Sequence, residues 1–163
     1  MSIPIYRLPI GVNCSSNNGK VTVSGTKGSV TFDSVSNIYR KGNMVIFLPF
    51  LTSYYSSIFT QAVQGVAFGY TIELSLKGIG YRVREENKKL IFSLGYSKPV
   101  LIDIPKDVSV IFNKQNFSIT SANLNILQDF ATTIRRYRFP DPYKGSGILY
   151  NGEVIICKEG KKT

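Results

Sequence analysis

Lys20-Val-Thr-Val-Ser-Gly25 and Leu90-Ile-Phe-Ser-Leu-Gly95 are two versions of one short pattern in this chain of 163 residues. In both, apolar residues alternate with others before a glycine, as in a half-buried strand that ends in a turn. Ser29-Val-Thr-Phe-Asp33 follows the first version, and Pro99-Val-Leu-Ile-Asp103 follows the second. The order of segments repeats at an offset of roughly seventy residues, which indicates an internal duplication.

Further strands are predicted on both sides of these segments. Gly25 and Gly28 frame the turn of a hairpin. The apolar run after Asn43 predicts a strand that Pro49 ends. Alternation of apolar and polar residues predicts three more strands, at residues 70–77, 108–112 and 117–120.

Each copy also carries one predicted helix. In the first copy, apolar residues recur at steps of three and four from Ser53 to about Phe68. In the second, Asn123 suits the N-cap of a helix with an apolar face of Leu124, Leu127, Phe130, Ala131 and Ile134. The sequence therefore predicts the α+β class: a tandem duplication of two small domains, each an antiparallel or mixed sheet with one helix packed on a face. We expect the domains at residues 1–76 and 77–163.

The composition favours a polyanionic partner and disfavours catalysis. Twenty Lys and Arg against ten Asp and Glu give a formal net charge of +10, and the pI is near 9.7. Histidine is absent, which removes the most common general base and metal ligand. Cys14 and Cys157 lack the spacing of a zinc site, and two reduced, buried thiols are favoured over a disulfide. We predict no enzymatic activity, no catalytic residue, no metal and no cofactor.

We expect no targeting segment, because the first ten residues lack the pattern of one, and no membrane insertion, because no apolar run is long enough to cross a bilayer. Its preference for Ile, Asn, Tyr, Phe, Lys and Ser, without Trp, is typical of an A+T-rich genome. Together these features favour synthesis where the protein works. We expect a mitochondrial location, with a plastid or a bacterial cytoplasm as the alternatives.

Positive charge is concentrated in the second copy. Through Leu76, five basic residues stand against two acidic ones, whereas the remainder has fifteen against eight. The densest block is Arg135-Arg-Tyr-Arg138-Phe-Pro-Asp-Pro-Tyr143-Lys144-Gly145-Ser-Gly147. Arginine matches phosphate oxygens, tyrosine stacks on unpaired bases, and glycine lets a phosphate approach the backbone. The alternative is that Arg135 and Arg136 only complement the negative C-terminus of the helix.

Three weaker candidates lie outside this block. Gly78-Ile-Gly80-Tyr81-Arg82-Val-Arg84 lacks the context of a nucleotide-binding loop, so we favour a strand edge with outward-facing arginines. Leu94-Gly-Tyr96-Ser-Lys98-Pro99 is either an RNA-contacting turn or an ordinary hairpin turn. The end, Lys158-Glu-Gly-Lys161-Lys162-Thr163, is either a solvated terminus or, as we expect, an extension that becomes ordered on RNA.

Taken together, these segments resemble the bacterial-type large-subunit ribosomal protein L-six family. The resemblance rests on Arg135 and Arg138, on Pro140-Asp-Pro-Tyr143-Lys144-Gly-Ser-Gly147-Ile148, and on Glu153 with the basic tail. It extends to Gly78–Arg82 and Leu94–Pro99, and thus over nearly the whole second domain and more faintly over the first. Ser146 departs from the Lys that is usual in the family, which removes one phosphate partner.

The resemblance implies a structural constituent of the large ribosomal subunit, without enzymatic activity. It implies rRNA binding near the factor-binding region, close to the sarcin-ricin loop and the base of the stalk. The implied partners are large-subunit rRNA, neighbouring large-subunit ribosomal proteins and nearby translation factors. The expected RNA-binding residues are Arg82, Lys98, Arg135, Arg138, Tyr143, Lys144, Gly145, Gly147, Lys158, Lys161 and Lys162.

Three other functions are weighed against this one. The runner-up is a stand-alone basic RNA-binding module outside the ribosome, although the sequence has no recognition helix, RRM aromatic pair or GXXG clamp. A metal-dependent enzyme would need Asp103 and Asp107, which are explained more simply by a strand end and a turn. A protein-binding role of the first domain, through Tyr54-Tyr55 and the aromatics from Phe47 to Phe50, could coexist with RNA binding, although such aromatics are more often core.

Overall fold

The computed structural model describes residues 5–34, 37–48, 53–113 and 116–160, and the chain divides into two compact units. The first unit comprises Met1–Tyr70 with Ser121–Leu124, and the second comprises Thr71–Thr120 with Asn125–Thr163. In the described part of the chain, neither helix combines the length and apolarity that a membrane crossing needs.

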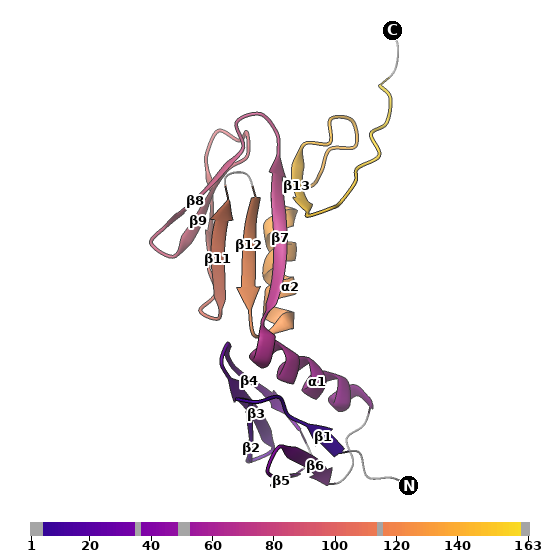
Figure 1. Cartoon of the computed structure of the whole chain (residues 1–163). Coiled ribbons are helices and arrows are strands. Elements are labelled where there is room, and N and C mark those ends of the chain that lie inside the picture. The colour runs from indigo at the N-terminus through magenta and orange to yellow at the C-terminus, as the bar shows by residue number, and fades with distance from the viewer. Residues whose placement is uncertain (1–4, 35–36, 49–52, 114–115, 161–163) are drawn as a thin grey trace. The chain divides into compact units, whose positions relative to one another are not determined.

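The first unit consists of two antiparallel sheets and a helix (Figure 1). Its elements are β1 (Ile5–Arg7), β2 (Asn13–Asn17), β3 (Lys20–Gly25), β4 (Gly28–Asp33), β5 (Asn37–Lys41), β6 (Met44–Leu48) and α1 (Ser53–Phe68). One sheet has the order β2-β3-β4, and the other has the order β1-β6-β5. All neighbouring strands in both sheets run antiparallel.

The core of the first unit forms where α1 packs on the strands. Val23 on β3, Val45 and Phe47 on β6 and Phe59 on α1 are all buried, as the alternation in the sequence predicts. The rings of Phe47 and Phe59 lie 4.8 Å apart edge to face, and the Tyr6 ring contacts both. Each buried side chain of this size stabilises the unit by roughly 1.5–3 kcal/mol, so the contacts of α1 hold the sheets together.

Glycine allows a distant segment to join the first unit. A Cβ atom at Gly65 in α1 would lie 2.0 Å from the carbonyl oxygen of Ala122. Such a distance is sterically forbidden, so only glycine permits this close approach. The contact explains why Ser121–Leu124 belongs to the first unit although its neighbours in sequence belong to the second.

The second unit repeats the plan with one strand more (Figure 1). Its elements are β7 (Tyr70–Lys77), β8 (Arg82–Glu86), β9 (Lys89–Ser93), β10 (Val100–Asp103), β11 (Val108–Asn113), β12 (Asn116–Ser121), α2 (Leu124–Arg136) and β13 (Gly147–Tyr150). One sheet has the order β10-β9-β8, and the other has the order β11-β12-β7-β13. β7 and β13 pair antiparallel, with Lys77 opposite Gly147.

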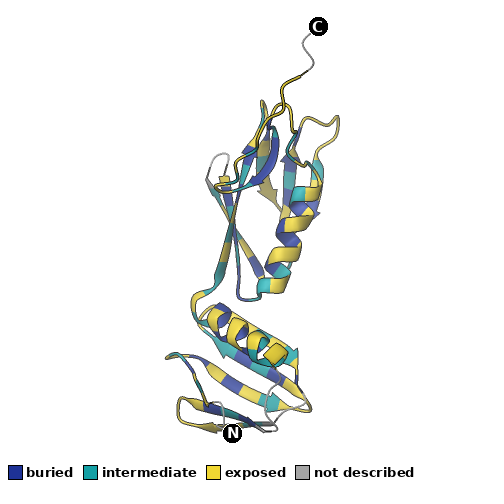
Figure 2. Cartoon of the chain, turned by 90° about the vertical axis from the view of Figure 1, so that its right-hand side faces the viewer, coloured by how far each residue is buried: buried dark blue, intermediate teal, exposed yellow. Residues whose placement is uncertain are grey.

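The core of the second unit lies under α2. The helix buries Leu127, Phe130, Ala131 and Ile134, four of the five residues that the sequence placed on its apolar face. Buried and exposed residues alternate along the strands, as Figure 2 shows by colour. The Phe92 and Phe117 rings contact each other at 5.7 Å, one from each sheet. The core therefore joins both sheets to the helix.

The predicted fold class is confirmed: the chain is an α+β protein in which a three-stranded meander, a hairpin and a helix occur twice in the same order. α1 spans the predicted residues, Ser53–Phe68. The division between the units falls at Tyr70, at the beginning of β7, whereas the boundary expected from the sequence lies at the end of this strand. β7 belongs with the second unit because it pairs with β13 along its later half.

Both cysteines are free, and they differ in exposure. Cys14 on β2 is buried, as the sequence led us to expect. Cys157 is exposed, and the expectation that it is buried is wrong. The reason is its position: residues 151–160 follow β13 outside any strand or helix, so the apolar side chains of this segment do not reach the core.

Candidate nucleic-acid interface

Three segments that are distant in sequence meet at Arg138, just beyond the end of α2. Its Nε donates a hydrogen bond to the hydroxyl of Tyr81 at 3.1 Å. Its guanidinium carbon lies 5.0 Å from the centre of the Tyr96 ring, and the Tyr96 hydroxyl donates to the Tyr137 carbonyl at 2.9 Å. Tyr96 and Tyr81 raise the pKa of Arg138 further above its ordinary value, so its charge is permanent. The segments around 81, 96 and 138, which the sequence singled out separately, form one site.

Residues 139–147 form a closed loop that follows α2 and ends at the first residue of β13. The Asp141 amide donates to the Ser146 carbonyl at 2.9 Å, and the Gly145 amide donates to the Asp141 carbonyl at 2.7 Å. The Asp141 carboxylate accepts a hydrogen bond from the Tyr143 amide at 2.9 Å. Such local bonds fix the loop before any ligand arrives, which lowers the entropic cost of binding.

The two glycines of this loop are buried, and packing within the protein explains both. A Cβ atom at Gly147 would lie 2.6 Å from Cα of Pro140 and 2.8 Å from the Phe139 carbonyl oxygen. Gly145 has φ +64°, and a Cβ there would lie 3.4 Å from Sγ of Cys157. Glycine is therefore needed here for close approach between backbone segments and for a left-handed turn. Contacts of these glycines with phosphate stay a prediction.

Three exposed lysines surround the turn at residues 142–145, and we call them the loop lysines: Lys77, Lys144 and Lys158. Lys144 lies in the turn itself. The Lys158 amide donates to the Pro142 carbonyl at 2.8 Å, which holds the tail beside the loop. Lys77 reaches the same turn from the end of β7, where its Nζ would lie 3.6 Å from a Cβ at Gly145. None of the three has an ion-pair partner in the described part of the chain.

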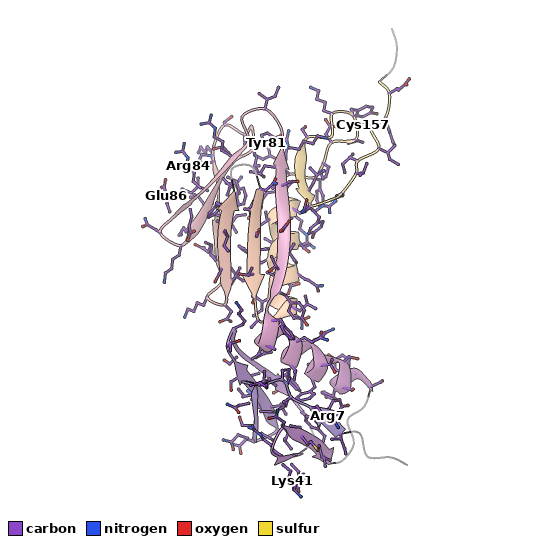
Figure 3. The ribbon with its side chains drawn as sticks, in the orientation of Figure 1. Arg7, Lys41, Tyr81, Arg84, Glu86 and Cys157 are labelled. Carbon is purple, nitrogen blue, oxygen red and sulfur yellow. The ribbon has the colours of Figure 1, made fainter. Side chains whose placement is uncertain are left out.

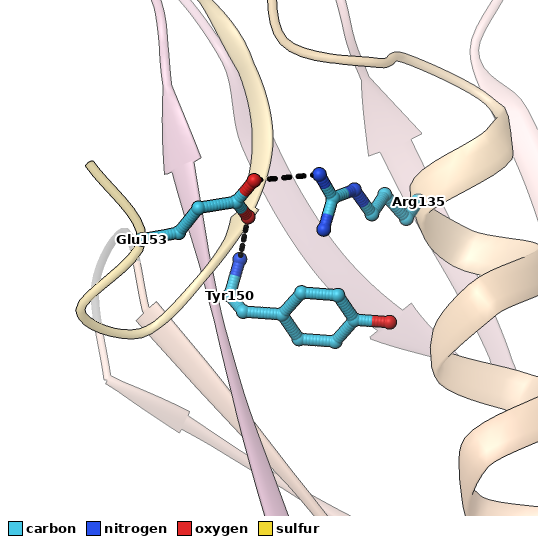
Figure 4. Close-up of polar contacts among 3 residues, drawn as sticks. All are labelled: Arg135, Tyr150 and Glu153. Atoms are coloured by element: carbon cyan, nitrogen blue, oxygen red, sulfur yellow. Dashed lines mark hydrogen bonds and ion pairs between the residues drawn. The ribbon is translucent and has the colours of Figure 1, made fainter. Parts of the chain in front are cut away.

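Arg135 is bound within the protein (Figure 4). Its Nη2 lies 2.6 Å from Oε1 of Glu153, and the side chains are only 22% and 24% exposed. Oε2 of Glu153 accepts a hydrogen bond from the Tyr150 amide at 3.1 Å, and the guanidinium lies 4.9 Å from the centre of the Tyr150 ring. A charge-assisted pair in this setting fixes the segment that follows β13 to α2. RNA binding by Arg135 itself stays a prediction.

The predicted residues Arg82 and Lys98 lie on another part of the second unit. Arg82 and Arg84 are exposed on β8, beside a shallow hollow of about 450 Å³. The Arg84 and Glu86 side chains extend away from the ribbon there (Figure 3). Lys98 is exposed in the turn before Pro99, which also lines the hollow.

Two further predicted residues, Lys161 and Lys162, lie outside the described residues. Asp103, named with Asp107 for the alternative metal site, has its carboxylate 3.0 Å from the Lys89 ammonium. No cluster of acidic and cysteine side chains suited to a metal ion occurs in residues 5–34, 37–48, 53–113 and 116–160.

Comparison with known proteins gives consistent matches. The family model for ribosomal protein L6 matches residues 77–151. The large ribosomal subunit protein uL6 of Limosilactobacillus reuteri is 38% identical over 166 residues, with 94% of this chain and 93% of that protein covered. The chain belongs to the ribosomal protein L6 family. The large ribosomal subunit protein uL6c of Phaeodactylum tricornutum is 36% identical, with 96% of this chain and 94% of that protein covered.

The range that matches the ribosomal protein L6 family model includes most of the site. It begins at Lys77 and contains Arg138, Tyr143 and Lys144, whereas Lys158 lies beyond it. Lys77 was missed as a site residue because the sequence shows it only as the polar end of a strand. Its pairing with Gly147 across β7 and β13, which places it at the loop, requires the tertiary structure. Tyr81 and Tyr96 were likewise noticed only as parts of their segments.

Proposed function

We propose that this chain is a structural constituent of the large ribosomal subunit and that its second unit binds rRNA through the loop lysines, Arg138 and Tyr143. The observation that carries the proposal is the gathering of three exposed lysines, without an ion pair among the described residues, around one hydrogen-bonded loop. Its ribosomal setting rests on membership of a family whose relatives bear the name of a large-subunit protein. No catalytic step is part of the proposed role.

The chemistry of the loop suits folded RNA. The loop lysines are compact charges on flexible stems, which suits contacts with phosphates whose exact positions vary. Tyr143 is 60% exposed at the same turn and offers a ring for an unpaired base or a ribose. Arg138 is held by Tyr81 and Tyr96, so its remaining donors are pre-oriented toward an RNA oxygen. Arg82, Lys98 and the tail lysines would supply supporting contacts.

We propose a location within the ribosome on the basis of the resemblance to the family. We place the second unit near the factor-binding region, close to the sarcin-ricin loop and the base of the stalk, with ribosomal proteins as neighbours and translation factors nearby. The composition typical of an A+T-rich genome leads us to propose a mitochondrial ribosome. The relatives named above come from a bacterium and from Phaeodactylum tricornutum, so a bacterial or plastid ribosome is the alternative.

The proposal is tested by removing the charge of the loop lysines without touching the Arg135–Glu153 pair. A triple variant, Lys77→Gln, Lys144→Gln and Lys158→Gln, is compared with a matched triple variant, Lys20→Gln, Lys27→Gln and Lys106→Gln. Both lose three positive charges from exposed positions. The affinity of each purified full-length chain for large-subunit rRNA is measured over a series of salt concentrations.

If the loop lysines contact phosphates, the slope of log affinity against log salt becomes shallower by about 2–3 for the first variant. The control variant keeps nearly the full slope, because its lysines contribute only long-range attraction. Sucrose-gradient sedimentation of tagged chains from native cells gives the second readout. Equal salt slopes and equal incorporation for both triple variants would mean that the RNA binds another face. If the unchanged chain stays at the top of the gradient, the protein is a stand-alone module.

A further inference from the structure

The outer face of the β1-β6-β5 sheet in the first unit carries an exposed apolar row. Ile5, Ile46 and Tyr39 stand directly opposite one another across the three strands. Paired residues of an antiparallel sheet project from the same face, so these side chains lie side by side. Ile5 is 56% exposed and Tyr39 is 57% exposed. The two outer side chains of this apolar row are therefore open to solvent.

The opposite face of this sheet is the one that α1 covers. Val45 and Phe47 are fully buried there, and the Tyr6 hydroxyl is hydrogen-bonded to Ser56 at the beginning of α1. The core of the unit is thus complete without Ile5, Ile46 and Tyr39. Ile46 is half-buried between the exposed Ile5 and Tyr39, and none of the three is needed to build the core. A contiguous apolar surface of this kind is typical of a docking site.

The next row on the outer face is basic. Arg7, Met44 and Lys41 are opposite one another, two residues along each strand from the apolar row. Met44 is 43% exposed, and neither Arg7 nor Lys41 has an ion-pair partner among the described residues. Figure 3 shows the Lys41 side chain extending away from the ribbon. No described residue on this face is acidic, so its two cations are available to a partner.

We propose that the outer face of the β1-β6-β5 sheet docks an acidic, amphipathic segment of a neighbouring protein. Apolar side chains of that segment cover Ile5, Ile46 and Tyr39, and its carboxylates contact Arg7 and Lys41. A second copy of this chain fits poorly because the same two cations would face each other. RNA would pair with the two cations, but its phosphates offer no apolar surface to cover the apolar row. A protein segment with both kinds of side chain satisfies both rows.

Carbodiimide cross-linking of native particles tests this proposal directly. The reagent joins a lysine amine to a carboxylate only when the two groups are in contact. Particles are purified through a tag on the full chain, cross-linked and analysed by mass spectrometry. We expect Lys41 to be joined to Asp or Glu of another protein, in a peptide that also contains aliphatic or aromatic residues. Lys41→Arg keeps the charge but removes the reactive amine, so this product should disappear.

A matched pair of variants separates the apolar row from general surface effects. Ile5→Ser with Tyr39→Ser should lower the yield of the Lys41 product about tenfold, because roughly 1.4 kcal/mol or more of apolar contact is lost. Ile10→Ser with Tyr54→Ser removes side chains that are 96% and 67% exposed elsewhere in the unit, and the yield should stay unchanged.

Several results would overturn the proposal. They are a Lys41 product within this chain or with a second copy, no Lys41 product at all, and an ultraviolet cross-link from Tyr39 to a nucleotide. Equal yields from the two double variants would show that the apolar row plays no part. Sedimentation of the same chains reports separately on ribosomal incorporation, so a failure of the proposed rRNA contact is distinguishable from a failure of this docking site.

Discussion

Replacement of Gly147 by alanine tests whether the loop of the candidate interface is fixed by close backbone packing. The added Cβ atom would lie 2.6 Å and 2.7 Å from Cα and N of Pro140, and 2.8 Å from the Phe139 carbonyl oxygen. All three are backbone atoms, so no rotamer change can relieve the contacts. Residues 138–140 or β13 must move, which strains the hydrogen bond from the Ile148 amide to the Arg138 carbonyl, now 3.0 Å long.

The expected cost follows from this geometry. Ordinary van der Waals contact begins near 3.4 Å, so the distance between the new Cβ and Cα of Pro140 must increase by several tenths of an ångström. Overpacking in a buried site of this kind costs about 2–3 kcal/mol. For a unit of this size, such a loss lowers the melting temperature by roughly 10 °C or more. Affinity for rRNA should also fall, because Arg138 moves away from Tyr81 and Tyr96.

The melting temperatures of the full-length variants are measured by circular dichroism, and the affinity for rRNA is measured in parallel. Gly160→Ala is the matched control, because a Cβ there meets nothing within 4 Å. The control should melt as the unchanged protein does. If Gly147→Ala melts within about 1 °C of the control, the close approach of Gly147 to Pro140 is absent in solution, and the account of the loop is incorrect.

Three further outcomes follow from individual contacts. Glu153→Gln should lower the free energy of unfolding by about 1–2 kcal/mol, because Arg135 keeps a half-buried charge without its partner. A double variant with Arg135→Met should lose less free energy of unfolding than the two single variants lose together. Tyr81→Phe removes the acceptor of Arg138 Nε, so affinity for rRNA should fall by roughly threefold to tenfold while circular dichroism shows the fold retained. Burial raises the pKa of Cys14 from 9.0 to about 11, against a smaller opposing effect of a nearby arginine. The unfolded thiol therefore ionises first, so the free energy of unfolding, measured by denaturant titration, should decline between pH 9 and 11. The decline should be shallower in Cys14→Ala, where only other groups such as the partly buried Tyr70 hydroxyl, whose pKa burial also raises, still contribute.

Much of the fold could be predicted because burial and periodicity agree in the longer elements. β3, β7 and α1 were found at their observed positions from apolar residues at alternate or helical spacing. β2 was missed because Asn13–Asn17 is polar apart from Cys14, and its pairing with β3 decides its conformation. β13 was missed because Gly147–Tyr150 is short and follows a loop rich in proline and glycine. Such strands depend on tertiary pairing more than on local preference.

The candidate site could be predicted only segment by segment. Composition drew attention to the block from Arg135 to Gly147, but it could not distinguish Arg135, which pairs with Glu153, from Lys144, which is free of ion pairs in the described part of the chain. The role of Tyr81 as partner of Arg138 depends on two segments that only the fold brings together. The sequence also does not show which backbone packs against the two glycines, whose contact with phosphate stays a prediction. Residue types indicate the chemistry, whereas the assignment of roles requires the contacts.

The most direct test of the proposed rRNA contact is a nucleotide cross-linking map of native particles. Large subunits from the native host are irradiated, and peptides of this chain that carry a nucleotide are identified by mass spectrometry. The account predicts adducts on peptides that contain Tyr143 with Lys144, and on those that contain Lys77 or Lys158. Adducts confined to residues 5–48 of the first unit, or a chain that carries none while it sediments with the subunit, would contradict it.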